Sequence, residues 1–184
     1  MQQIVEIPKL TYQDYCALPD DGKRYEIIDG DLFVTPSPVT KHQRAARNLL
    51  FLIEGYLRNK PLGELLAAPF DVILDDHTIV APDLVYVRSE NRQVLTDKNI
   101  QGAPDLVIEI LSPSTARMDR VLKLRKFAER GVAHYWIVDP AAETLEAMEL
   151  AEGTYRMVFA SDVKGVFEPS LFPGLRIPIR EIFR

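Results

Sequence analysis

The most informative stretch for the fold is Pro104-Asp105-Leu106-Val107-Ile108-Glu109-Ile110-Leu111. Its composition is typical of a strand that is apolar on both faces. Such a strand belongs inside a sheet whose two faces are covered, usually by helices. Glu109 interrupts the apolar run, and a buried carboxylate is costly unless it meets a cation, often a metal. An ion pair with Arg or Lys is the purely structural alternative.

A second apolar run, Pro82-Asp83-Leu84-Val85-Tyr86-Val87, carries a carboxylate near its start. Pro82 interrupts the strand expected from Thr78 to Arg88, so the pattern predicts an edge or a bulge that redirects Asp83. If the two runs are neighbouring strands, Asp83 and Glu109 can share one divalent cation.

The segments around these strands follow ordinary periodic patterns. Ser112-Pro113-Ser114 ends the central strand, and a helix to about Arg130 with Gly131 behind it leads to a strand at 132–138. This order predicts a βαβ unit with parallel strands. Three-and-four spacing of apolar residues predicts an amphipathic helix over 40–59.

The remaining segments are predicted from caps and turns. They are a short helix within 9–19 capped by Thr11, a hairpin over 25–34 around Asp29-Gly30, a strand at 67–74, a polar loop with a helical turn at 89–103, and a C-terminal hairpin of 144–150 with 154–160. The fold class is therefore α/β or α+β, with a mixed sheet flanked by helices and a β-hairpin near each end.

Length and composition favour one domain over residues 1–184, with a substantial core. No apolar run has the length of a membrane span and no signal peptide is visible, so we expect a cytoplasmic protein without a membrane partner. Cys16 is the single cysteine, which excludes an internal disulfide and a cysteine-cluster zinc site.

The net charge of −5 argues weakly against nucleic-acid binding, but basic residues are clustered. Six lie between Thr115 and Gly131, and Lys41, Arg44 and Arg47 form a second group. Each cluster is either a phosphate-facing patch or an ordinary solvated helix face.

Glycine-rich phosphate loops, a Gly-x-Ser-x-Gly elbow and His-x-x-x-His spacing are all absent from the sequence. What remains is an oxygen-rich set of Glu26, Asp83, Glu109 and Asp105, the ligand chemistry that Mg²⁺ or Mn²⁺ prefers. Asp105 and Glu109 are about 13 Å apart along one strand, so they cannot hold the same ion, and Asp105 is better explained as a turn or cap group.

His42 falls in the first turn of the helix predicted over 40–59. A single histidine there is either a polar surface or cap-adjacent group, or a ligand for substrate or metal.

The chain resembles the Uma-type family of putative restriction endonucleases, in the PD-(D/E)XK nuclease superfamily. The resemblance is carried by the blocks Tyr25-Glu26-Ile27-Ile28-Asp29-Gly30, Ser37-Pro38 with His42, Pro82-Asp83-Leu84-Val85, Pro104 to Ser114, Lys123-Leu124, and Tyr135-Trp136-Ile137-Val138-Asp139-Pro140. It covers nearly the whole chain, from about Tyr12 to Leu175.

The resemblance implies a restriction-endonuclease-like core and Mg²⁺-dependent cleavage of phosphodiester bonds in DNA. Asp83 and Glu109 match the two acidic positions of the motif. Leu111 stands where the superfamily pattern has lysine, and Lys123 in the following helix is the expected replacement. Helical spacing places Lys123 away from the Met118 face, so a solvated lysine is the alternative.

These matches give a mechanistic hypothesis. Asp83, Glu109 and the carbonyl of Ile110 hold the divalent ion, and Lys123 positions water or neutralises the phosphate. Glu26 and His42 complete the cavity by binding metal or relaying a proton. Cleavage of both strands would favour a homodimer.

Two other classes of function remain open. One is a non-catalytic module with the nuclease fold that binds DNA or assembles with a partner, which Leu111 and the acidic net charge favour. The other is a metal-dependent hydrolase of small phosphate substrates, which an enclosed pocket would favour.

Overall fold

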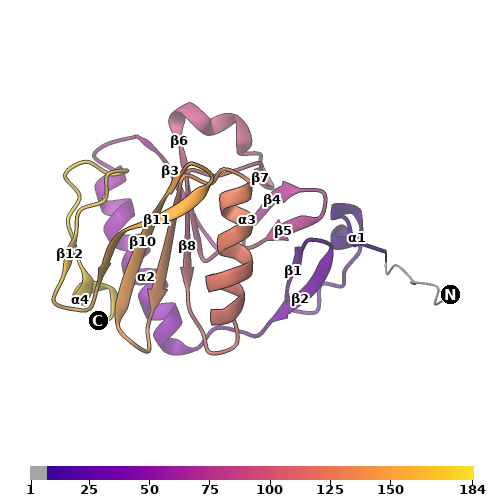
Figure 1. Cartoon of the computed structure of the whole chain (residues 1–184), viewed down its shortest axis with the longest axis horizontal. Helices are drawn as coiled ribbons and strands as arrows, with labels where there is room; N and C mark the ends of the chain where they lie inside the picture. The colour runs from indigo at the N-terminus through magenta and orange to yellow at the C-terminus, as the bar shows by residue number, and fades with distance from the viewer. Residues whose placement is uncertain (1–7) are drawn as a thin grey trace.

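The computed structural model describes residues 8–184, and within this range the strands form two principal mixed sheets and a small two-stranded one. The larger sheet has six strands, in the spatial order β11 (Thr154–Ser161), β10 (Thr144–Ala151), β9 (His134–Asp139), β8 (Leu106–Ile110), β6 (Leu84–Arg88) and β3 (Gly63–Ala67). β8 is parallel to β9 and antiparallel to β6, which confirms the βαβ prediction and a mixed sheet (Figure 1).

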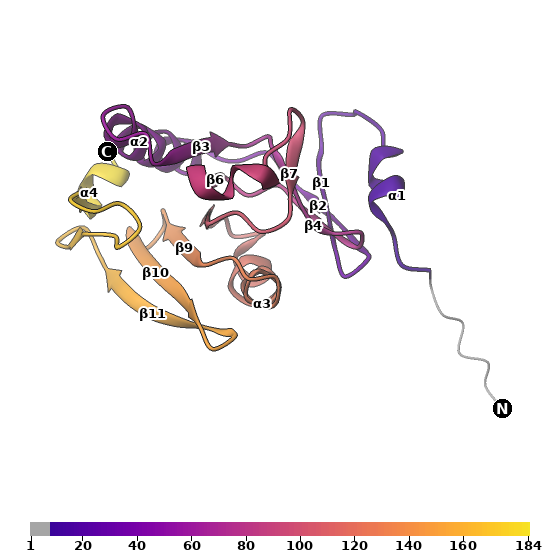
Figure 2. The same cartoon turned by 90° about the horizontal axis from the view of Figure 1, so that it is seen from above.

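The two faces of β8 pack against different helices, as its apolar run predicts. Leu106, Ile108 and Ile110 belong to a core shared with α2 (Thr40–Leu57). Val107 belongs to a second core that includes Phe127 of α3 (Leu124–Glu129). Figure 2 shows α2 and α3 on opposite sides of the larger sheet. Glu109 shares the α3 side with Val107, because alternate residues of a strand point the same way.

The smaller sheet has five strands within the described residues, in the order β2 (Asp31–Thr35), β1 (Arg24–Ile28), β5 (Thr78–Val80), β4 (Asp71–Asp75) and β7 (Asn99–Gln101). The predicted hairpin is confirmed, with Asp29 and Gly30 both at positive φ in its turn. The predicted short helix is α1 (Tyr12–Cys16), with Thr11 and Asp14 in a reciprocal cap.

Two strand predictions were wrong in the same way. The segment predicted as one strand over 67–74 is divided between β3 and β4, which lie in different sheets. The segment from Thr78 to Arg88 is divided between β5 and β6, so Pro82 lies in a crossing between sheets rather than in a bulge. Pro69 and Pro82 lack the N–H that continuous pairing requires, so the chain leaves one sheet at each proline.

The helix predicted after the central strand contains η2 (Met118–Lys123), a π-helical segment that continues into α3. Gly131 follows at φ +81°, as expected for a left-handed helix end. In the polar stretch 89–103, η1 (Ser89–Val94) is the expected helical turn, whereas the short strand β7 was not predicted.

The C-terminal hairpin is confirmed by the antiparallel pairing of β10 with β11. The tail beyond it adds β12 (Val166–Phe167), β13 (Ile177–Pro178) and α4 (Ile179–Ile182), which cover the α2 side of the core. Among the described helices, none is both long and apolar enough to span a membrane.

Candidate active site

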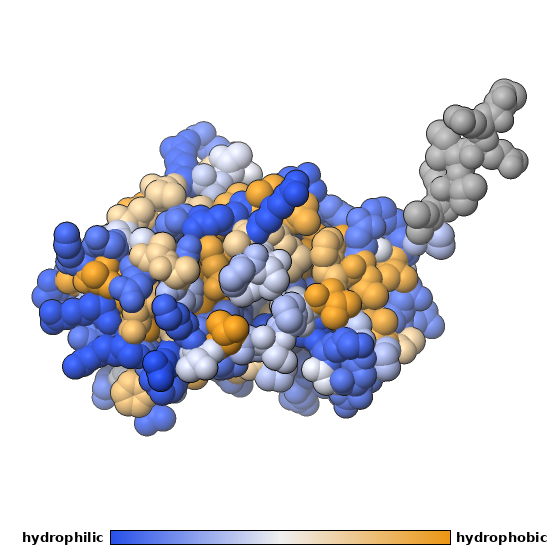
Figure 3. Space-filling view, turned by 90° about the horizontal axis from the view of Figure 1, so that it is seen from below, coloured by the Kyte–Doolittle hydropathy of each residue, from blue (hydrophilic) through white to orange (hydrophobic). Residues whose placement is uncertain are grey.

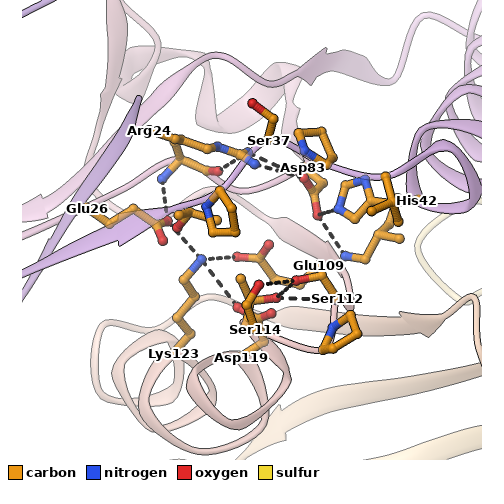
Figure 4. Close-up of a pocket in the computed structure, with 18 residues that line it drawn as sticks. Arg24, Glu26, Ser37, His42, Asp83, Glu109, Ser112, Ser114, Asp119 and Lys123 are labelled. Carbon is orange, nitrogen blue, oxygen red and sulfur yellow. Dashed lines mark hydrogen bonds and ion pairs between the residues drawn. The ribbon is translucent and has the colours of Figure 1, made fainter. Parts of the chain in front are cut away.

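A cavity of about 250 Å³ lies where β8 ends and where α2 and the η2–α3 helix begin, at the lower end of the molecule in Figure 1. Its walls come from segments far apart in the sequence, among them β1, the β2–α2 connection and the crossing before β6. Figure 4 shows their side chains converging on the space beyond the end of β8. All five predicted catalytic side chains, Glu26, His42, Asp83, Glu109 and Lys123, line this cavity.

Asp83 is fixed above the end of β8 by three donors. Its Oδ2 accepts a hydrogen bond from the backbone N–H of Ile110 at 2.8 Å and lies 3.1 Å from His42 Nε2. Its Oδ1 lies 3.3 Å from an Arg24 nitrogen. Since a carboxylate only accepts, the His42 proton in this contact resides on Nε2. The crossing between sheets at Pro82 therefore places Asp83 against the backbone of Ile110, the residue that follows Glu109.

The surroundings of Asp83 favour its ionised form. Burial by itself would raise the pKa of Asp83, but the hydrogen bond from His42 and the charges of His42 and Arg24 outweigh burial, so the pKa is lowered. Asp83 is thus an anion held among cationic and donor groups.

Lys123 lies at the centre of the other half of the cavity. Its ammonium is 2.8 Å from Glu26 Oε1, 2.9 Å from Glu109 Oε1 and 3.4 Å from Asp119 Oδ1. Lys123 is only 4% exposed, whereas Val121 on the other face of η2 is 57% exposed. The helix therefore turns its Asp119–Lys123 side inward, and the alternative of a solvated lysine was wrong.

The charges around Lys123 shift its pKa and those of its partners. Burial would lower the pKa of Lys123, but the three carboxylates raise it well above its usual value. Burial raises the pKa of Glu109 well above its usual value, and the negative charges of Asp119, Asp83 and Glu26 add to the effect against the opposing charge of Lys123. Burial likewise raises the pKa of Asp119. Glu109 thus has both a lysine partner and an unfavourable excess of negative neighbours.

The donor set suits a hard divalent ion. The cavity contains four carboxylates, Glu26, Asp83, Glu109 and Asp119, against two permanent cations, Arg24 and Lys123. With all four carboxylates ionised, the excess is two negative charges, which a divalent ion would neutralise. Oxygen ligands of this kind fit Mg²⁺ or Mn²⁺.

No group of three or more His, Cys, Asp or Glu side chains between residues 8 and 184 forms a ready-made metal cluster. The carboxylates instead contact cationic or donor groups. Lys123 lies among three of them, and Asp83 accepts hydrogen bonds from Arg24 and His42. Two buried polar atoms of the site, His42 Nδ1 and Asp119 Oδ1, have no hydrogen-bond partner in the part of the chain that the structure describes.

Two charged lining residues were not singled out from the sequence, Arg24 and Asp119. Each has a local signal in hindsight. Arg24 stands two residues before Glu26 in β1 and so shares its face, and Asp119 stands four residues before Lys123 in a helix. Asp105, set aside as a turn group, accepts hydrogen bonds from the Arg88 N–H and the Asn91 side chain.

The two predicted basic clusters differ in the structure. In the helical cluster, Arg120 pairs with Glu146, Lys126 with Asp29, and Arg130 with Asp75. A phosphate-facing patch there is therefore largely neutralised. Lys41, Arg44 and Arg47 of α2 have no carboxylate partner among residues 8–184.

Comparison with solved structures supports the fold. A crystal structure described as a putative nuclease belonging to DUF820, from Anabaena variabilis, superposes with a TM-score of 0.78 at 20% sequence identity, covering 95% of this chain and 97% of the other. No curated protein matches this chain.

Comparison with protein families agrees with the resemblance stated from the sequence. The profile of the Uma2 family, described as "Putative restriction endonuclease", matches residues 12–180. The match includes every side chain of the cavity described above. Because it extends over nearly the whole sequence, this chain belongs to the Uma2 family of putative restriction endonucleases.

Proposed function

We propose that this nuclease-family chain is an endonuclease that hydrolyses phosphodiester bonds of DNA with the help of Mg²⁺ or Mn²⁺. One observation carries the proposal. Two carboxylates, Asp83 just before β6 and Glu109 of β8, line the same cavity at the end of β8. The N–H of Ile110 donates to Asp83 at 2.8 Å, and the buried Lys123 contacts Glu109 at 2.9 Å.

The ion would be held by Asp83, Glu109 and the backbone carbonyl of Ile110. The chemistry that a divalent ion supplies in such a site is activation of water for attack and stabilisation of charge on the phosphate. His42 and Arg24 orient Asp83 and keep it ionised. These contacts make Asp83 a preorganised ligand rather than a mobile one.

Lys123 supplies the positive charge beside Glu109. Glu26 holds its ammonium from one side and is itself fixed by the Ala81 N–H at 2.9 Å. An incoming phosphate oxygen can replace one of the carboxylates around Lys123, which lowers the cost of bringing a further anion into the cavity. Within residues 8–184, His42 Nδ1 has no hydrogen-bond partner, so this nitrogen can form a hydrogen bond with a substrate or a water.

The test is a supercoiled-plasmid nicking assay with Mg²⁺, Mn²⁺ or EDTA, run with the wild-type chain and with Glu109→Gln and Asp83→Asn. We expect nicking that needs the ion and falls at least about 100-fold in both variants, the scale of a lost catalytic group. Unchanged nicking by Glu109→Gln would falsify the assignment. Duplex cleavage on both strands would favour two copies of the site, so sedimentation with and without DNA tests for a homodimer.

A non-catalytic module is the second candidate, and one observation favours it. Within the described residues, every carboxylate of the cavity already has a cationic partner, and no metal cluster is preformed. DNA binding without cleavage under any of the three conditions would select this candidate. Cleavage of a mononucleotide ester without nicking would instead select a small-phosphate hydrolase.

A further inference from the structure

A groove of about 900 Å³ lies next to the cavity described above. The two share Arg24, His42, Asp83 and the connection 35–38, so the groove opens onto the Asp83 half of the site. Figure 3 looks onto the end of the molecule that contains the site, where pale residues of intermediate hydropathy lie near the centre and strongly hydrophilic residues gather to the left. Of the two spaces that Asp83 lines, this groove is the larger.

One wall of the groove is a stripe along α2. Gln43, Ala46, Arg47 and Leu50 recur at three-and-four spacing, so they share one side of the helix. This stripe differs from the core-facing positions of α2, which are fully buried. The opposite wall includes the turn 67–69 between β3 and β4.

The groove combines apolar surface with a few polar groups. Val34, Pro36, Leu50 and Leu84 supply apolar lining, and Gln43 supplies an amide that both donates and accepts hydrogen bonds. A nucleobase has the matching properties, because its faces stack on apolar side chains and its edge forms hydrogen bonds.

The charge of the groove is centred on Arg47. Lys23 is paired with Asp21 at 2.6 Å, and Arg24 is engaged by Asp83. Arg47 donates only to the Asn48 amide oxygen, at 2.9 and 3.1 Å, and has no carboxylate partner among residues 8–184. A guanidinium without an anion at the edge of a groove is suited to a phosphate.

The size of the groove limits what enters it. Its volume is near the upper end of the range for single-ligand pockets, roughly 300–1,000 Å³. A base enters such a recess only when it is out of the helical stack, which costs a few kcal/mol in a paired duplex and least in DNA that is already single-stranded.

Building on the proposed endonuclease function, we propose that this groove holds an unpaired nucleotide beside the phosphodiester bond that is cut. The substrate is then DNA with a single-stranded segment, such as a gap, a flap or a frayed end, rather than an intact duplex. Arg47 contacts a phosphate of the unpaired strand, and the Gln43–Leu50 side of α2 contacts its base.

The binding test uses fluorescence anisotropy in EDTA, so that it does not depend on cleavage. The probes are a labelled oligodeoxythymidylate and a blunt hairpin duplex with the same number of phosphates. Three variants each lower the net charge by one, Arg47→Gln and Gln43→Glu in the groove and Arg44→Gln outside it. Gln43, Arg44 and Arg47 are all exposed, so the variants are expected to fold, and thermal unfolding checks this.

We expect the single strand to bind about tenfold more tightly than the duplex, the scale of stacking one base. Arg47→Gln and Gln43→Glu should each weaken single-strand binding about five- to tenfold. The new carboxylate in Gln43→Glu acts by lying one helical turn from Arg47. Arg44→Gln should change binding by less than about twofold, because only nonspecific attraction is reduced.

Two results separate this proposal from the proposed function. If all three variants weaken binding equally, or if the duplex binds as tightly as the single strand, the groove proposal is overturned even when plasmid is nicked. If the groove variants behave as expected while no DNA is cleaved with any metal, the endonuclease proposal is overturned and the groove stands as a site for unpaired DNA.

Discussion

The two halves of the cavity differ in their balance of charge. Around Asp83, one carboxylate lies among Arg24, His42 and a backbone donor, and its pKa is lowered. Around Lys123, one ammonium lies among three carboxylates, and burial raises the pKa of Glu109. The Asp83 half stabilises its own charge, whereas the Lys123 half has an excess of negative charge. A cation placed between the two halves would neutralise the excess negative charge around Lys123 and would leave the contacts of Asp83 with Arg24 and His42 in place.

The largest expected effect comes from Lys123→Met, because it leaves Glu26, Glu109 and Asp119 buried without their shared cation. We expect a loss of about 3–5 kcal/mol in the free energy of unfolding at neutral pH, the usual result of breaking a buried pair. Urea unfolding measures the loss. Arg125→Gln is the matched control on the same helix, and its exposed ion pairs should contribute about 1 kcal/mol or less. Equal losses in the two variants would refute the contrast between the buried contacts of Lys123 and the exposed contacts of Arg125.

The next effect is stabilisation by Mn²⁺, which tests whether the two halves share an ion. At a concentration 100 times the dissociation constant, a bound ion stabilises the folded state by about 2.7 kcal/mol. Thermal unfolding with increasing Mn²⁺ should show this increase in the wild-type chain and lose it in Asp83→Asn and in Glu109→Gln. If one of these variants retains the full increase in stability with Mn²⁺, the residue that it replaces is not a ligand of the ion.

Asp83→Asn is expected to cost about 2 kcal/mol, because it leaves the buried His42 and the half-buried Arg24 without their anion. The lowered pKa of Asp83 also fixes the sign of its pH dependence. Its stabilisation is present above the unfolded pKa of aspartate, near 4, and is lost as the pH falls through the folded value. Unfolding measured down the acid range should therefore be flatter in Asp83→Asn than in the wild type.

Glu109→Gln should have the smallest effect on stability and the opposite pH dependence. Because the folded pKa of Glu109 is raised, the folded state binds its proton more tightly than the unfolded state does. Stability then falls with rising pH above about 4.3, by up to 1.4 kcal/mol per unit, until the folded pKa is passed. Glutamine does not ionise and so removes this dependence on pH. The free energy of unfolding of the variant at neutral pH should therefore equal or exceed that of the wild type. A wild-type stability that rises across this window would contradict the excess negative charge assigned to the Lys123 half.

Local patterns in the sequence predicted many of the elements and drew attention to the two acidic residues. Asp29-Gly30 predicted the first hairpin, apolar spacing predicted α2, and the run 104–111 predicted a central strand covered on both faces. These features depend on neighbouring residues, so local patterns are sufficient. Asp83 and Glu109 were identified because a carboxylate in an apolar run is conspicuous.

The arrangement of these elements in space became clear only from the three-dimensional structure. It showed that Pro69 and Pro82 each mark a crossing between sheets, which a one-dimensional strand pattern does not distinguish from a bulge. It also decided which way Lys123 points, because the η2 helix has apolar residues on both sides and packing on β8 selects the face that turns inward. Arg24 reaches Asp83 for a similar reason: the two residues are 59 positions apart in the chain, and that sequence separation carries no information about their distance in the fold.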